Sequence, residues 1–194
     1  NASATSICIG ENVTLNGGGA ISYTWDNGVT NNVSFIPAST TTYSVTGTDA
    51  KGCINTALVN VQVNPKPIVT ATGGAYCIGS TGVTLGASGA VTYVWSPATD
   101  LSASNIANPI ANPATTTTYT VTGTDANGCK NDATATVTVN TLPNVTANSS
   151  SPVICATQTV TLTGLGATTY TWDNGVFDNV AFTPTSTQTY TVTG

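Results

Sequence analysis

The chain is poor in charge. Charged side chains make up 6% of its 194 residues, with three lysines, no arginine, no histidine and a formal net charge of −5. So few basic groups exclude binding to nucleic acid through phosphate contacts. We also expect no membrane span in this segment, because no apolar run approaches the ~20 residues that a spanning helix needs.

The residue types of most catalytic and metal sites are also scarce. There is one glutamate, and the sequence has no G-x-S-x-G elbow, no Walker loop and no C-x-x-C pair. Zinc requires clustered Cys or His, and calcium about six to eight oxygen ligands. The acids fall singly in turns, where we expect them to serve turn geometry: Asp26, Asp49, Asp125 and Asp173. We predict no enzyme activity, no cofactor and no metal.

What is present favours strands. Hydrophobic residues make up 40% of the chain, which is too many for a disordered segment, and threonine alone occurs 41 times. In Thr117–Gly123 the side chains of Tyr119 and Val121 alternate with threonines, and the same period of two recurs in Ala133–Val139 and in Val91–Trp95. Such alternation is typical of strands with one buried face, so the sequence predicts an all-β fold.

Internal repeats determine the organisation. The segment Ile21–Gly47 is closely similar to Thr168–Gly194, and Val91–Gly123 is a third copy with a six-residue insertion between its Trp and Tyr. Proline-containing linkers at 64–67 and 140–143 separate the copies, which gives tandem β-sandwich domains at residues 1–65, 66–142 and 143–194.

The first and last copies are incomplete at the two ends of this sequence. The third stops before its last hairpin and strand, and the first has no counterpart of the strand "PIVTAT" that opens the second. We expect a window on a longer array. The alternative is that the missing strands are supplied by a neighbouring subunit, through strand addition at a sheet edge.

The repeated motif "YTWDNG…F.P..T.TYTVTGTDA.GC" resembles the Ig-like and PKD-like repeats of large secreted surface proteins of Bacteroidota, which include gliding adhesins and type IX secretion cargo. The resemblance covers all three copies and implies Ig-like β-sandwiches. It also implies two core aromatic residues in each repeat. The first is a tryptophan on a middle strand, and the second is a tyrosine on a later strand: Trp25 and Tyr43, Trp95 and Tyr119, and Trp172 and Tyr190. The alternative for the tryptophans is that their rings form a surface platform on which sugars stack, but we expect them to pack in the core.

Five cysteines recur in register with the repeats. Cys8 with Cys53, and Cys77 with Cys129, enclose loops of similar length, and we predict both pairs as disulfides. Each would stabilise its repeat by about 4 kcal/mol in the chain-entropy model. Cys155 has no partner within these residues. Because disulfides persist in oxidising compartments, the pairs predict an extracellular, secreted or cell-surface location.

The low charge implies that something else keeps the surface hydrophilic. Covalent glycans are one solution, and N-glycosylation sequons begin at Asn1, Asn12, Asn32, Asn144 and Asn148. In a bacterium, O-glycans on Thr or Ser are the expected form. The alternative is that Asn and Thr are simply frequent in turns and strands, so that the sequons arise by chance.

Two functions fit these observations. The first is an extracellular structural protein whose repeats associate end to end, with one another or with other copies, into a cell-surface filament. The second is a stalk or spacer of a giant adhesin whose ligand-binding part lies elsewhere.

Overall fold

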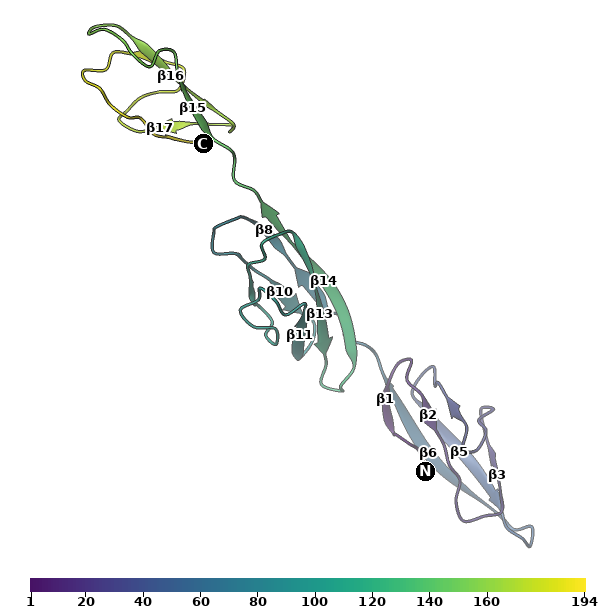
Figure 1. Cartoon of the computed structure of the whole chain (residues 1–194). Helices are drawn as coiled ribbons and strands as arrows, with labels where there is room; N and C mark the ends of the chain where they lie inside the picture. Colours follow the sequence, from purple (N-terminus) through teal and green to yellow (C-terminus); the bar gives the residue numbers. More distant parts are fainter. The chain divides into compact units, whose positions relative to one another are not determined.

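A computed structural model describes all residues 1–194 and contains strands, turns and loops but no helix (Figure 1). Accordingly, no helix in it is long and apolar enough to cross a membrane. The chain divides into two compact units, Asn1–Val139 and Asn140–Gly194. The first unit holds repeats 1 and 2, and the second holds repeat 3. The predicted all-β fold of tandem Ig-like sandwiches is confirmed.

Repeat 1 is built around its long last strand. Its strands are β1 (Ser6–Cys8), β2 (Val13–Thr14), β3 (Ser22–Trp25), β4 (Ser34–Phe35), β5 (Thr41–Thr48) and β6 (Ile54–Asn64). One sheet has the order β1-β6-β5-β3, and β2 pairs with β4 in a second sheet. Strand β6 is antiparallel to β5 but parallel to β1, and this register sets Cys8 beside Asn64, at the far end of β6 from Cys53.

Repeat 2 has the same plan with additional short strands. They are β7 (Thr70–Thr72), β8 (Gly74–Cys77), β9 (Val83–Thr84), β10 (Gly86–Ser88), β11 (Thr92–Ser96), β12 (Ile110–Ala111), β13 (Thr117–Thr124) and β14 (Lys130–Asn140). The main sheet has the order β11-β13-β14-β8, so β14 lies between two strands, as β6 does in repeat 1.

Unit 2 has fewer strands, and they are shorter: β15 (Thr146–Ser149), β16 (Val160–Leu165), β17 (Thr171–Trp172), β18 (Ala181–Phe182) and β19 (Val192–Thr193). Its sheets have the orders β15-β16-β18 and β17-β19. No strand occupies the place of β6 or β14. The segments that flank that strand in the other repeats, Pro152–Cys155 and 187–190, are consequently not part of any sheet.

The alternation seen in the sequence corresponds to burial. Tyr119, Val121 and Val137 are fully buried, while the threonines between them face outward or are half-buried. One expectation fails at a strand end, because Val91 is 66% exposed although Trp95, on the same predicted face, is buried. Val91 precedes β11 and lies beyond the edge of the core.

The turn residues after two of the tryptophans adopt a left-handed backbone. Asn27 has φ 52° and Gly28 φ 71°, and Asn174 and Gly175 repeat these values closely at 55° and 71°. Asn and Gly tolerate this region with little strain, so the two W-D-N-G turns form the same local structure in repeats 1 and 3.

Candidate functional site

The most distinctive covalent feature of the chain joins two repeats. Cys8, at the end of β1 in repeat 1, forms a disulfide with Cys129, just before β14 in repeat 2, with a Cα–Cα distance of 5.5 Å and a sequence separation of 121. Both residues are buried. We call Cys8, Cys129 and the neighbouring Asn64, Pro67 and Asn131 the cystine junction.

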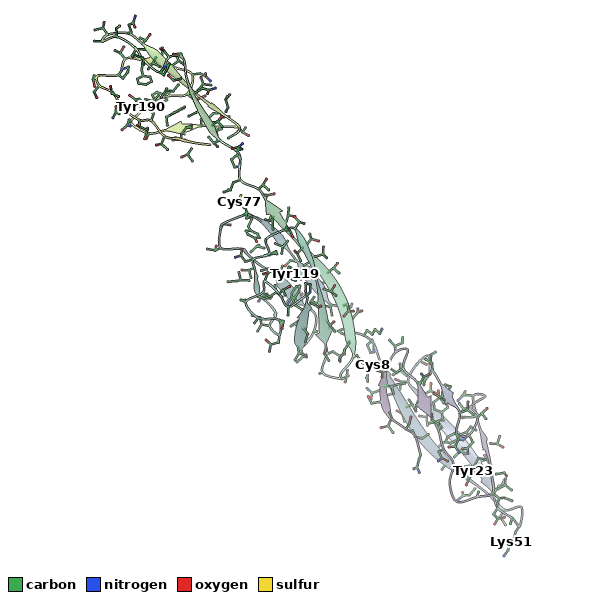
Figure 2. All side chains as sticks on the ribbon, in the orientation of Figure 1. Cys8, Tyr23, Lys51, Cys77, Tyr119 and Tyr190 are labelled. Atoms are coloured by element: carbon green, nitrogen blue, oxygen red, sulfur yellow. A yellow bond between two sulfur atoms is a disulfide. The ribbon has the colours of Figure 1, made fainter.

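This pairing corrects the sequence-based prediction of Cys8–Cys53 and Cys77–Cys129. Cys8 lies beside Asn64 at one end of β6, whereas Cys53 precedes Ile54 at the other end. A strand of that length spans roughly 35 Å, and a disulfide needs Cα atoms within about 7 Å. Two cysteines in one repeat therefore cannot meet, and Cys53, Cys77 and Cys155 are free and exposed. In Figure 2, Cys8 and Lys51, the latter beside Cys53, mark opposite ends of repeat 1.

The hairpin cysteine is held by an aspartate. The Asp125 Oδ1 atom accepts hydrogen bonds from the backbone N–H groups of Asn127 (2.9 Å) and Cys129 (2.8 Å). Asp49 does the same for Lys51 and Cys53 in repeat 1. The carboxylate thus closes the turn and fixes the backbone of the cysteine. This explains the T-D-A-x-G-C motif, because the aspartate holds the cysteine in a defined position at the hairpin turn.

The partner cysteine also sits on an ordered turn. The backbone N–H of Cys8 donates to Glu11 Oε2 at 2.8 Å, and the N–H of Glu11 donates back to the carbonyl of Cys8 at 3.0 Å. The same reciprocal pair joins Cys155 to Gln158. The sole glutamate of the chain therefore has a structural role at the junction.

Repeats 1 and 2 are joined by two covalent connections, the linker and the cystine. A hydrogen bond reinforces them, since Asn131 Nδ2 donates to the carbonyl of Pro67 at 3.0 Å. In repeat 1, Asn64 is buried, and its Nδ2 donates to Ser6 Oγ and to the carbonyl of Ile7. With two connections and ordered ends, the junction has much less freedom to bend than a single linker would.

The tryptophans lie inside the repeats. Trp25, Trp95 and Trp172 are at most 6% exposed, which leaves no ring face for stacking on a sugar. Each indole N–H has an acceptor: Asn31 Oδ1 (3.0 Å), the Ile106 carbonyl (3.0 Å) and Asp178 Oδ1 (2.9 Å), respectively. In repeat 2 the acceptor comes from the segment with the six-residue insertion.

The later tyrosines differ between the repeats. Tyr43 and Tyr119 are buried, whereas Tyr190 is only half-buried. Phe35 packs edge to face on Tyr43, and Phe182 on Tyr190, with ring centroids 5.4 and 5.3 Å apart. Burial, with a smaller contribution from the nearby carboxylate of Asp100, raises the pKa of Tyr119.

A groove of about 810 Å³ opens on unit 2 beside Tyr190. Its apolar lining includes Val153, Ile154, Val160 and Leu162, and no charged side chain contributes to it. We call this the strand groove, because it lies between the two segments that flank β6 and β14 in the other repeats.

A second group of tyrosines was not identified from the sequence as a structural element. Tyr23, Tyr93 and Tyr170 each place the hydroxyl within 2.6–2.9 Å of both the backbone N–H and the carbonyl of the alanine three residues earlier. We call this contact the tyrosine clamp. The repeated A-x-x-Y spacing was the available signal.

The remaining candidate residues lie at the surface. No group of three His, Cys, Asp or Glu residues is arranged to hold a metal ion. The five sequon asparagines are all exposed: Asn1, Asn12, Asn32, Asn144 and Asn148. Their exposure makes these asparagines accessible to modification.

No protein family model matches the chain, and no curated protein sequence matches it. Among solved structures, it is similar to immunoglobulin domains 1–4 of Sidekick-1, with 15% identity, a TM-score of 0.34, and coverage of 87% of this chain and 58% of that one. For the N-terminal eight Ig domains of the Down syndrome cell adhesion molecule, the values are 14%, 0.31, 87% and 28%. For the human desmocollin-1 ectodomain they are 12%, 0.30, 93% and 51%.

Proposed function

We propose that this chain is a segment of an extracellular structural protein in which Ig-like repeats are joined end to end by disulfides into a filament. The observation that carries the proposal is the cystine between consecutive repeats. A disulfide inside each repeat would stabilise separate beads, whereas Cys8–Cys129 ties one repeat to the next. A disulfide also supports an oxidising, extracellular location.

The free cysteines supply the means of extending the array. Cys53 occupies in repeat 1 the hairpin position that Cys129 has in repeat 2, and it is exposed. Cys77 and Cys155 occupy the position of Cys8 in their own repeats and are also exposed. The same pairing rule then joins a hairpin cysteine of one repeat to a strand-end cysteine of a repeat in another copy.

Oxidation of the purified chain tests this rule. Under mild oxidation, non-reducing gels should show a ladder of covalent oligomers, and peptide mass spectrometry should find Cys53 bonded to Cys77 or Cys155 of a second copy. Cys53→Ser should end the ladder at once, because it removes the only free hairpin cysteine. Ladders that persist in Cys53→Ser would show random thiol oxidation and would contradict the proposal.

Electron microscopy of the native material separates the filament from the adhesin stalk that the sequence also allows. Regular fibres are expected, and single flexible strings would favour the stalk. We also propose glycans on the exposed asparagines or on Thr and Ser, which an intact mass spectrum would detect. The resemblance to Bacteroidota surface proteins stays a prediction, as does the absence of enzyme activity.

A further inference from the structure

We propose that unit 2 binds a β-strand of the β14 type in its strand groove, between the segment Val153–Cys155 and residues 187–190. The inference deepens the proposed function, because it names the kind of polypeptide that would complete this repeat.

The first reason is that a strand occupies the same position in the other two repeats. This strand is β6 in repeat 1 and β14 in repeat 2, and its inward side chains Val61 and Val137 are fully buried. The register sets Val61 opposite Thr41, and Val137 opposite Thr117. The counterpart of Thr41 and Thr117 in repeat 3 is Gln188. Beside Gln188, where the partner strand would lie, is the open groove of about 810 Å³. The groove therefore has the place, and the apolar lining, that a strand occupies twice elsewhere in this chain.

The second reason is the backbone on either side of the groove. Neither Pro152–Ile154 nor residues 187–190 make a hydrogen bond to another backbone segment. Along an extended chain, successive N–H groups point to opposite edges. Thr191 N–H faces Asp173, to which it donates at 3.0 Å, so the N–H groups of Gln188 and Tyr190 point into the groove. An incoming strand would satisfy these donors, antiparallel to 187–190 and parallel to Val153–Cys155.

The third reason concerns which strand could enter. Within residues 1–194, β6 and β14 each already lie between two partners, so neither is free to fill the groove. We therefore assign the occupant to a polypeptide segment outside these residues, with the chemistry of β14. It alternates threonine with small apolar side chains, and the part that faces the lining is uncharged, since the groove has no charged side chain to pair with one.

A peptide with the sequence of Lys130–Asn140, added to the full chain, tests the proposal. We expect saturable binding by fluorescence anisotropy of the labelled peptide, and a rise in the unfolding temperature of unit 2 that grows with peptide concentration. A peptide with Val137→Asp places a carboxylate in the apolar lining and should bind at least about tenfold more weakly. Its matched control, the peptide with Thr138→Asp, places the same charge on the outer face and should bind within about twofold of the parent.

Three variants of the full chain test the receptor edge. Gln188→Pro removes an N–H that points into the groove and makes no bond in this structure, so it should weaken peptide binding by roughly tenfold without unfolding unit 2. Thr189→Pro removes a backbone N–H one residue on, where it points to the opposite edge, and should bind nearly normally. Gln188→Ala, which loses only the side chain that accepts from the Tyr190 hydroxyl at 3.3 Å, should also bind nearly normally. Equal loss in both proline variants would overturn the proposal.

Two further outcomes would also overturn it. If the Val137→Asp and Thr138→Asp peptides bind alike, the groove is only a sticky apolar surface. If sedimentation shows dimers of the chain that the peptide cannot dissociate, a second copy covers the groove instead. Either failure would leave the cystine ladder intact, so the two proposals are tested separately.

Discussion

Repeats 2 and 3 share the same strand motifs, yet only one of them has a closed core. In repeat 2, Trp95, Tyr119 and Leu85 are at most 1% exposed. In repeat 3, Leu162 is 7% exposed and Tyr190 is half-buried, whereas Trp172, at 6%, is as buried as Trp25 of repeat 1. Leu162 and Tyr190 both line the strand groove, at the position that β14 occupies in repeat 2. The last strand of the sandwich thus covers the side of the core on which these two residues lie.

Removing the central tryptophan should give the largest contrast between these repeats. Trp95→Ala empties a closed core and should cost unit 1 about 3–5 kcal/mol of unfolding free energy. Trp172→Ala should cost unit 2 less, because its core already opens onto the groove. Hydrogen exchange of each unit during urea titration measures both. Thr92→Ala, on the exposed face of β11, is the control, and equal losses in the two units would contradict the role assigned to β14.

Breaking the cystine junction should affect only one unit. Cys8→Ser with Cys129→Ser should destabilise unit 1 by about 2–4 kcal/mol, since the constraint on its unfolded state is lost. Unit 2 should keep its unfolding midpoint in calorimetry. Cys77→Ser changes a free, exposed thiol and serves as the control. A matching loss in that variant would mean that the chain, when folded in solution, uses a different pairing.

The tyrosine clamp should contribute equally to the stability of the two units. Tyr93→Phe and Tyr170→Phe each remove a hydroxyl with two backbone partners, and each should cost about 1–2 kcal/mol. The clamp lies away from the position of β14, so an open groove should not change its contribution. Denaturant midpoints of the two variants provide the measurement. A much smaller loss for Tyr170→Phe would show that the whole of unit 2 is loosened, and not only its open side.

The smallest effect should come from Tyr119 of unit 1 at alkaline pH. The pKa of Tyr119 is raised in the folded state, so the folded chain holds the phenol proton more tightly than the unfolded chain does. This stability is fully present below pH 10.0, the ordinary value, and is lost as pH rises through the folded pKa. The slope for one proton is at most about 1.4 kcal/mol per pH unit. Tyr119→Phe should abolish this part of the alkaline loss in pH-dependent unfolding, and an unchanged slope would assign it elsewhere.

Much of the fold could be predicted from local patterns. The period of two around Tyr119 and in β14 defined strands and their buried faces. The W-D-N-G turns at Asn27 and Asn174 have the left-handed backbone that Asn and Gly tolerate with little strain. Such features depend on residues that are close in sequence, so the sequence alone can specify them.

The cysteine pairing could not be predicted in the same way. Matching loop lengths suggested bonds within a repeat, but β1 pairs with β6 in a parallel direction, and this places Cys8 at the end of repeat 1 that faces the linker. A parallel or antiparallel choice between strands distant in sequence leaves no local signature in either of them. The tyrosine clamps were overlooked for a different reason, since their A-x-x-Y spacing was visible but has several uses in strands.

Local sequence patterns specified which residues become strands, which turns join them and which side chains face the cores, because these depend on side-chain alternation and on the backbone preferences of Asn and Gly. Which cysteines meet was settled by tertiary packing. This pairing depends on how strands far apart in the chain are ordered and directed within a sheet, and that order is set by packing over the whole repeat.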